Sequence, residues 1–250
     1  MIARAANVGA AAHAVPPTMG APQMDADVLR DVLQWDVQSW KVALDFWSAR
    51  LRGQSGLDCL EIGAGAGGLS LWLALKGHRV TCSDRSDVAR ASAALHQKHD
   101  VACTITYVDV DATAIDFEEC FDVVVFKSVL GGIGRADRAD RQEQAIQQMH
   151  KALRPGGQLL FAENGAASPL HRLMRETFVP WGAEWRYPTR EEMLRFLEPF
   201  RHVELRSTGF LAAFGRSERQ RQLLALIDRA GVNRVIPESV GYILYGAAVK

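Results

Sequence analysis

The 250-residue chain lacks an excess of charge of either sign. Its 29 lysines and arginines equal its 29 aspartates and glutamates, so the formal net charge is zero with neutral histidines. Proteins that bind nucleic acids commonly carry a basic excess that neutralises phosphates. The balance therefore argues against a nucleic-acid partner, although it is compatible with a local basic patch.

Long hydrophobic runs and paired cysteines are also missing. No run approaches 18 apolar residues, so we expect no membrane-spanning segment and no membrane partner. The cysteines form no CxxC pair, which argues against a cysteine-based metal site. Three of them lie in apolar runs predicted to be buried strands, and free, scattered cysteines are typical of a reducing cytoplasm. The four are Cys59, Cys82, Cys103 and Cys120.

The N-terminal stretch, residues 1–23, differs in composition from the rest. It is rich in alanine, contains three prolines, and its apolar part is interrupted by Asn7, Gly9 and His13. A signal peptide needs an uninterrupted apolar region. We therefore predict a flexible tail.

Apolar runs alternate with helical segments between residues 57 and 164. The runs are continuously apolar, which is typical of parallel strands covered on both faces. The predicted strands are Leu57–Ile62, Arg79–Ser83, Val101–Val108, Asp122–Phe126, Gln158–Ala162, Val203–Leu205 and Tyr242–Val249. We predict a doubly wound α/β fold, with a mostly parallel seven-stranded sheet, an antiparallel C-terminal strand and a helical cover.

The loop after the first strand is the strongest local signal for a ligand. It holds Gly63, Gly65, Gly67 and Gly68. Glycines let the backbone turn sharply and approach a ligand, and the following helix offers unpaired N–H groups. Asp84 ends the next strand, where a carboxylate can accept hydrogen bonds from ribose hydroxyls. The pattern favours an adenosine-containing cofactor over the plainer alternative, a tight turn followed by a helix cap.

The position of Glu61 helps to distinguish between classes of adenosine-containing cofactor. The glycine spacing satisfies both GxGxxG and GxGxG, so spacing alone does not exclude a dinucleotide. A carboxylate at Glu61, two residues before the loop, would repel a pyrophosphate and attract a cationic amino group. It favours a cofactor that joins adenosine to an amino acid.

The segment Leu60–Gly67 (LEIGAGAG) resembles motif I of the class I S-adenosylmethionine-dependent methyltransferases. Asp84 and three further segments fit that family in order and spacing: Asp111–Phe117 (DATAIDF), Phe121–Val125 (FDVVV) and Leu153–Leu160 (LRPGGQLL). The resemblance covers residues 57–164 closely and the last two strands loosely. It implies S-adenosyl-L-methionine as the cofactor and a small molecule as the methyl acceptor.

The resemblance also implies roles for single residues. Gly63 and Gly65 would contact the methionyl part and Asp84 the ribose. Asp111 would accept from the adenine amino group, with Asp109 as the alternative, and Phe126 or Lys127 would face the amino group of the cofactor. The expected cofactor set is Glu61, Gly63, Ala64, Gly65, Asp84, Arg85, Asp111, Ala112, Phe126 and Lys127.

The chain departs from the family after the fourth strand. Many members carry two histidines there, whereas this chain has Val129–Gly134 (VLGGIG). These glycines remove one candidate for a general base and predict a flexible rim. The asparagine-proline-aromatic motif of DNA amino-methyltransferases is absent as well, which again argues against a nucleic-acid substrate.

The acceptor side is less well defined by sequence. Aromatic side chains can bind a flat acceptor or a sulfonium, so Trp35, Trp40, Trp181 and Trp185 are the candidate acceptor-binding residues. Candidate bases are Glu163, His171 and Tyr187, although Glu163 could instead orient a loop. His96 and His99 have no evident third ligand, and we predict no metal site.

These observations predict a cytoplasmic methyltransferase that acts on a small molecule in specialised metabolism or sugar tailoring, with a homodimer left open. An NAD(P)-dependent oxidoreductase and a non-catalytic methyltransferase-like partner subunit are the alternatives. We expect residues 24–250 to form a single domain. Its expected segments are an N-terminal cover helix (24–52), a cofactor-binding core (57–164), an acceptor-side cover (165–198) and closing strands (199–250).

Overall fold

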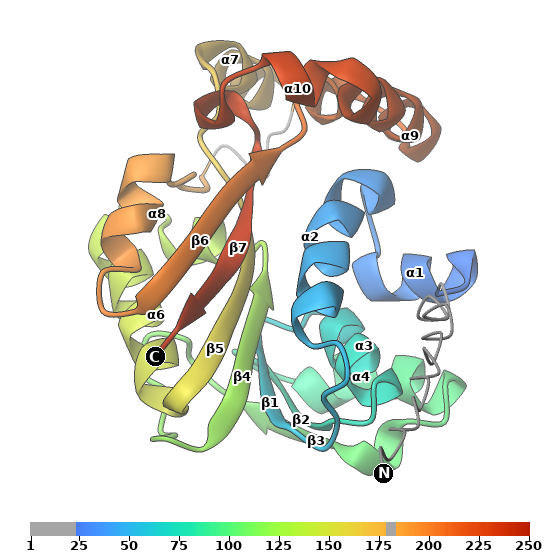
Figure 1. The fold of residues 1–250 in the computed structure, drawn as a ribbon, viewed down its shortest axis with the longest axis vertical. Helices are drawn as coiled ribbons and strands as arrows, with labels where there is room; N and C mark the ends of the chain where they lie inside the picture. The colour runs from blue at the N-terminus through green and yellow to red at the C-terminus, as the bar shows by residue number, and fades with distance from the viewer. Residues whose placement is uncertain (1–23, 179–183) are drawn as a thin grey trace, which may run out of the picture.

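A computed structural model of the chain describes residues 24–178 and 184–250. The predicted tail and Trp181 lie outside the described residues. The centre is a seven-stranded sheet in the order β3-β2-β1-β4-β5-β7-β6 (Figure 1). The strands are β1 (Asp58–Ile62), β2 (Arg79–Asp84), β3 (Ile105–Asp109), β4 (Phe121–Lys127), β5 (Leu153–Asn164), β6 (Arg201–Thr208) and β7 (Ile243–Val249). The first five strands pair in parallel, and β7 runs antiparallel to both β5 and β6, which confirms the predicted fold class.

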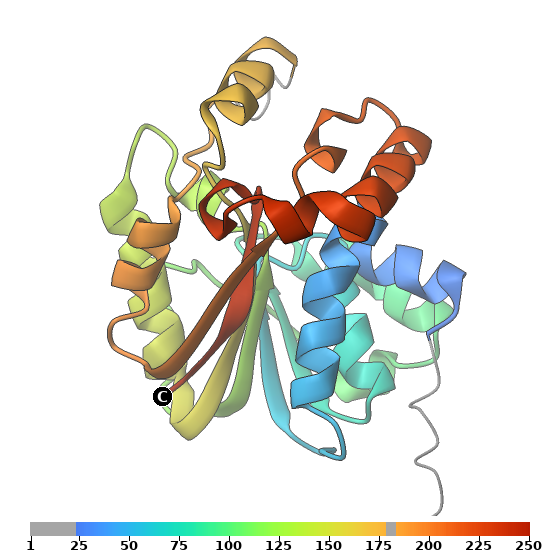
Figure 2. The ribbon, with the colours of Figure 1, turned by 45° about the horizontal axis from the view of Figure 1, so that its top comes forward.

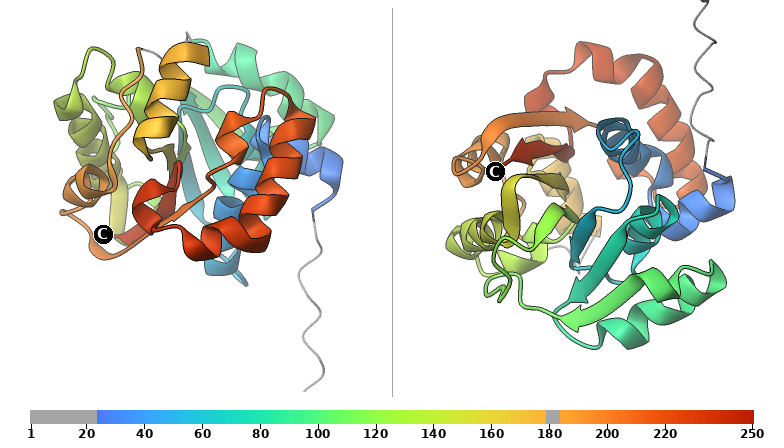
Figure 3. Two further views of the ribbon diagram at one scale, coloured as in Figure 1. Left: turned by 90° about the horizontal axis from the view of Figure 1, so that it is seen from above. Right: turned by 60° about the horizontal axis from the view of Figure 1, so that its bottom comes forward.

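Helices cover both faces of this sheet. The α-helices are α1 (Ala26–Leu33), α2 (Val37–Arg50), α3 (Gly68–Leu75), α4 (Val88–Lys98), α5 (Leu130–Ile133), α6 (Ala139–Ala152), α7 (Pro169–Phe178), α8 (Arg190–Phe196), α9 (Glu218–Ile227) and α10 (Asn233–Val235). Helices α2, α3 and α4 lie on one face, and α6 and α8 on the other (Figure 1). Helices α7, α9 and α10 lie beyond the carboxyl ends of the parallel strands (Figures 2 and 3). No helix within the described ranges is both long and apolar enough to cross a membrane.

Two hydrophobic cores, one on each face, explain why the central strands are continuously apolar. Successive side chains of a strand point to opposite faces. In β4, Val123 and Val125 pack in the core under α2 and α3, whereas Val124 and Phe126 pack in the core under α6 and α8. All four are essentially inaccessible to water. Burial on both faces therefore removes the polar alternation that a one-sided sheet would show.

The N-terminal cover consists of two helices, α1 and α2, which are separated at residues 34–36. Gln34 and Asp36 have positive φ angles of 68° and 45°, which end α1 and begin α2. The carboxylate of Glu218, on α9, accepts the backbone N–H groups of Asp36 and Val37 at 3.1 and 3.2 Å. A helix start needs such acceptors, and here a residue 182 positions away supplies them.

The closing segment, residues 199–250, contains helices as well as strands. Helices α9 and α10 are inserted between β6 and β7. The buried carboxylate of Asp228 accepts the backbone N–H groups of Phe210, Leu211 and Ala212 at 2.9–3.0 Å. This contact ties the inserted helices to the end of β6.

The start of α8 is set by a capping box, in which Thr189 and Glu192 are bonded reciprocally at 3.1 and 2.9 Å. The expectation of three buried cysteines is wrong, because Cys103 and Cys120 are exposed and only Cys59 and Cys82 are buried. Cys103 lies in a short 3-10 helix that precedes β3, where an extended strand had been predicted.

Candidate functional site

Two adjoining cavities lie at the carboxyl ends of β1, β2 and β4. The outer cavity has a volume of about 360 Å³ and the inner cavity about 240 Å³. Both are lined by Gly63, Ser128 and Trp185, so they meet at these residues. The outer cavity is also lined by Asp84, Arg85, Asp111, Ala112 and Arg141, and the inner cavity by Trp35, Glu61, Ala64, Gly65, Gly68 and Lys127. Most of the cofactor set expected from sequence therefore lines these two adjoining cavities.

The glycine loop between β1 and α3 borders both cavities, and Gly63 lines each of them. Gly63 has a φ of +65°, and a Cβ there would lie 2.5 Å from the Cγ2 atom of Val129. Both the backbone conformation and the close approach therefore require glycine. The Asp84 carboxylate accepts the Gly65 N–H at 2.8 Å and that of Arg85 at 2.7 Å. Asp84 thus orients the loop as well as lining the outer cavity.

Two residues of α4 hold the loop from behind, and sequence reasoning missed both. The Ser92 hydroxyl donates to the Gly65 carbonyl at 3.1 Å. The His96 ring is fully buried, with Nε2 2.9 Å from the Gly67 carbonyl and Nδ1 2.9 Å from the Tyr107 hydroxyl. Burial lowers the pKa of His96, so the neutral ring donates to Gly67 and accepts from Tyr107. The four-residue spacing of Ser92 and His96, which places both on one helix face, was the available signal.

Glu61 supports the start of α3 from within the sheet. Its carboxylate accepts the Leu69 and Ser70 N–H groups at 3.2 and 2.7 Å and the Ser70 hydroxyl at 2.5 Å. Burial raises the pKa of Glu61 to about 7, while these hydrogen bonds and the Lys127 charge act in the opposite direction. The carboxylate caps a helix and lines the inner cavity at the same time.

The last two residues of β4 point to opposite faces of the sheet. Phe126 is fully buried against Phe161, at 6.3 Å between ring centroids, so its side chain does not reach the cavities. The Lys127 ammonium lies over the rings of Trp35 and Trp40, at 4.8 and 5.0 Å, and lines the inner cavity. Of the two residues expected to face the cofactor here, only Lys127 has a side chain that lines the inner cavity.

Asp109 and Asp111 are likewise separated by the structure. Asp109 accepts the backbone N–H groups of Asp87 and Val88, both at 3.1 Å, and so caps α4. Asp111 lines the outer cavity, and its Oδ1 accepts from the Thr113 N–H and hydroxyl at 2.8 and 2.7 Å. These bonds lower the pKa of Asp111, which keeps it ionised at neutral pH.

Trp185 covers the junction of the cavities by lying against α5. A Cβ added to Gly131 would be 2.6 Å from Cε3 of this indole, and one added to Gly132 would be 3.9 Å from Cζ2. The glycines of the predicted rim therefore leave the space that Trp185 occupies. The backbone bond from Arg186 N–H to the Gly131 carbonyl, at 3.1 Å, fastens the same segment to α5.

The candidate bases are not brought to the cavity walls. Glu163 is buried and accepts the N–H groups of Val129, Leu130 and Asn164 at 2.6–2.9 Å, and burial raises its pKa to about 7. His171 is buried among aromatic rings and contacts the Ser168 hydroxyl at 2.7 Å and the Phe210 carbonyl at 2.9 Å. Neither they nor Tyr187 are among the described residues that line the two cavities. Glu163 therefore orients the loop before α5.

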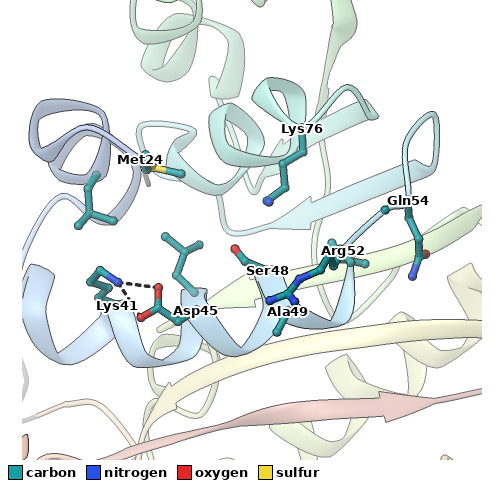
Figure 4. Close-up of a pocket in the computed structure, with 12 residues that line it drawn as sticks. Met24, Lys41, Asp45, Ser48, Ala49, Arg52, Gln54 and Lys76 are labelled. Atoms are coloured by element: carbon teal, nitrogen blue, oxygen red, sulfur yellow. Dashed lines mark hydrogen bonds and ion pairs between the residues drawn. The ribbon is translucent and has the colours of Figure 1, made fainter. Parts of the chain in front are cut away.

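A third cavity, of about 570 Å³, lies away from the glycine loop, between α2 and the end of α3 (Figure 4). Lys41 and Asp45 form an ion pair at 2.7 Å along one wall. Lys76 extends from the end of α3 towards α2, and its ammonium lies 5.8 Å from the Trp72 ring centroid. None of the site residues expected from sequence lines this cavity.

Sequence comparisons cover the same core. Residues 60–161 match a family described as a methyltransferase domain. The ubiquinone biosynthesis O-methyltransferase of Pseudomonas syringae pv. tomato is 29% identical over 117 residues, which are 46% of this chain and 48% of that protein. The chain thus spans about half the length of the curated relatives it matches.

Structural comparisons extend over more of the chain. The N-methyltransferase NodS from Bradyrhizobium japonicum, in complex with S-adenosyl-L-homocysteine, aligns with a TM-score of 0.55 and 19% identity over 84% of this chain and 86% of its own. The [4+2]-cyclase SpnF aligns with a TM-score of 0.59 and 17% identity over 86% and 80%. At such identities the likeness concerns the fold alone. Together, the matched sequence, the strand order and the glycine loop identify residues 60–161 as a methyltransferase domain with the fold of the class I S-adenosylmethionine-dependent enzymes.

Proposed function

We propose that the chain transfers a methyl group from S-adenosylmethionine to a small-molecule acceptor. The observation that carries this proposal is the charge distribution along the two adjoining cavities. The outer cavity presents Asp84 and Asp111, and the inner cavity presents Glu61 next to Lys127. An elongated ligand with a hydroxyl-rich adenosine at one end and an amino acid at the other fits this arrangement. A dinucleotide would instead bring a pyrophosphate against the buried Glu61 carboxylate.

The cavities suggest how such a cofactor is held. We expect Asp84 to accept from the ribose hydroxyls, and Asp111 with the Ala112 backbone to border the adenine. Gly63 and Gly65 leave room for the methionyl chain to cross from one cavity to the other. The support for this placement is that these five residues line two cavities that adjoin at Gly63.

The bound cofactor supplies a methyl group on a sulfonium, which the acceptor atom takes in an in-line displacement. The protein's part is to hold the acceptor about 3 Å from the methyl carbon and in line with the bond that breaks. Trp35 and Trp185 line the inner cavity and offer aromatic faces to a flat acceptor or to the sulfonium. Because Glu163 and His171 bond elsewhere, we expect catalysis to rest mainly on positioning, with Tyr187 as the remaining candidate base.

We propose an acceptor from specialised metabolism or sugar tailoring. The aromatic lining supports a planar or partly apolar molecule, and the cavities suit a small ligand in volume. The identity of the methylated atom is left to experiment, which should offer oxygen, nitrogen, sulfur and carbon nucleophiles in parallel.

The test combines binding with turnover. Calorimetry with S-adenosylmethionine, S-adenosylhomocysteine and NADH should give binding of the first two and none of NADH. Incubation with methyl-labelled cofactor and a panel of acceptors should then transfer the label. Absence of binding by both sulfur compounds would refute the proposal, and NADH binding in their place would favour an oxidoreductase. Tight binding without transfer to any acceptor would favour the non-catalytic partner subunit.

A further inference from the structure

Lys127 is a partly buried cation without an anionic partner in contact. Its ammonium is close to the rings of Trp35 and Trp40, and no hydrogen bond or ion pair of this group occurs within residues 24–178 and 184–250. Burial lowers the pKa of Lys127 to about 8. Buried charges in proteins are normally paired, since desolvation of an isolated ion is costly.

Three carboxylates surround Lys127 without bonding it. They are Glu61 on β1, Glu163 on β5 and Asp36 at the start of α2, and each attracts the ammonium electrostatically. Glu61 is bonded to the start of α3 and Glu163 to the loop before α5. Asp36 accepts from the Tyr242 hydroxyl. Each carboxylate is therefore bonded through at least one oxygen to another group, and the Lys127 side chain lines the inner cavity.

The inner cavity contains only two ionisable residues among those described as lining it, and they have opposite signs. These are Glu61 and Lys127. The amides at the start of α3, which could otherwise bind an anion, donate to Glu61 instead. An anionic group that enters this cavity thus finds its positive charge at Lys127.

We infer that Lys127 binds the α-carboxylate of the cofactor's amino-acid end, while Glu61 faces its α-amino group. This inference rests on the proposed function and reverses the role that the family resemblance implies for Lys127. Two ammonium groups in a poorly solvated cavity would repel each other, whereas the cofactor's carboxylate can bond the Lys127 ammonium directly, which none of the three surrounding carboxylates does. A cation arriving beside Glu61 also favours its ionised form, which burial alone disfavours.

The test removes the carboxylate from the ligand and the ammonium from the protein in turn. Calorimetry should compare S-adenosylhomocysteine with its decarboxylated analogue, which keeps the adenosine, the sulfur and the amine. For the wild-type protein we expect the analogue to bind about ten- to a hundredfold more weakly, as is typical of a lost charge-assisted bond in a buried site. In Lys127→Gln and Lys127→Met, the two ligands should bind within about threefold of each other.

Lys76→Gln is the matched control, because Lys76 also lies over a tryptophan ring but lines the distant third cavity. It should retain the full preference for the carboxylate. Equal binding of both ligands by the wild type would overturn the inference whatever the variants show. So would an undiminished preference in folded Lys127→Gln, which would show that other groups hold the carboxylate. Failure of the wild type to bind S-adenosylhomocysteine at all would instead refute the proposed function.

Discussion

Glu61 and Glu163 are two buried carboxylates with a shared structural role. Each lies in a strand of the sheet and accepts backbone N–H groups from a neighbouring turn, at the start of α3 for Glu61 and before α5 for Glu163. Burial raises the pKa of each to about 7. Their position at strand ends was predictable, but the sequence could not show that their oxygen atoms are taken up by backbone donors.

The raised pKa of Glu163 predicts a pH-dependent stability. Its carboxyl titrates near 4.5 when unfolded and near 7 when folded, so the protonated form is favoured in the native state. The contribution to stability is present below about pH 4.5 and is lost as the pH rises to about 7. Glu163→Gln cannot titrate, so the stability of the wild type relative to this variant should fall by a few kcal/mol over that range.

Urea unfolding of both proteins at half-unit steps between pH 4.5 and pH 8 measures this difference. Glu61→Gln should give a similar curve, because the same burial acts on that carboxyl. Parallel stability curves for the wild type and both variants would contradict the assignment of a raised pKa to these groups.

Gly131 and Gly132 provide a matched pair for the role of Trp185. Alanine at Gly131 would overlap the indole, whereas alanine at Gly132 leaves ordinary contact at 3.9 Å. Overpacking of this kind costs about 1–3 kcal/mol. We therefore expect Gly131→Ala to weaken S-adenosylhomocysteine binding about tenfold, and Gly132→Ala to change it less than about twofold. Equal dissociation constants for the two variants would show that Trp185 does not cover the ligand.

At the scale of elements, the contact between α1 and α3 positions the N-terminal cover against the glycine loop. A Cβ at Gly68, the first residue of α3, would lie 2.1 Å from the Val32 carbonyl of α1. Val32 lines the inner cavity together with Gln34 and Trp35 from the turn that follows. The close approach of the two backbones therefore brings the covering turn to the ligand.

Gly68→Ala should disturb this contact. We expect it to lower the free energy of unfolding by about 1–3 kcal/mol and to weaken cofactor binding, since α1 must move away. Gly231→Ala is the control, because a Cβ there meets nothing within 4 Å. Chemical denaturation and calorimetry on both variants check the prediction, which would be wrong if the two behaved alike.

The helix boundaries that sequence reasoning left open are those that depend on distant partners. The break between α1 and α2 is stabilised by Glu218 of α9 and by the buried Tyr242, which donates to Asp36. Nothing within residues 24–52 shows these acceptors and donors. By contrast, the start of α8 follows from Thr189 and Glu192 alone, because both partners of that cap are local.

At the scale of the whole molecule, the covers are joined to the sheet by buried contacts. The Trp47 indole of α2 donates to the Gly246 carbonyl of β7 at 3.0 Å, across 199 positions of sequence. Helix α2 also contacts α9. These contacts support the prediction, still to be tested, that residues 24–250 form a single domain.

The single-domain prediction requires one cooperative unfolding transition. Far-UV circular dichroism and tryptophan fluorescence should give coincident curves in urea. S-adenosylhomocysteine at a hundred times its dissociation constant should stabilise the native state by about 2.7 kcal/mol and raise the melting temperature by roughly 5–11 °C. Two separate transitions, with only one responding to the ligand, would indicate two domains.

The sequence by itself determined the parallel sheet, the glycine loop and the acids at the strand ends. Continuous apolar runs, glycine conformations and short-range spacing depend on neighbours along the chain, so they can be recognised without coordinates. Only the tertiary structure decided which of these side chains face the cavities. Phe126 and Lys127 are adjacent in sequence but point to opposite faces of the sheet, and Gly131 meets Trp185 only through folding. The physical reason is that packing between distant elements decides whether a side chain is exposed or buried. The same packing decides which partner each charged group meets.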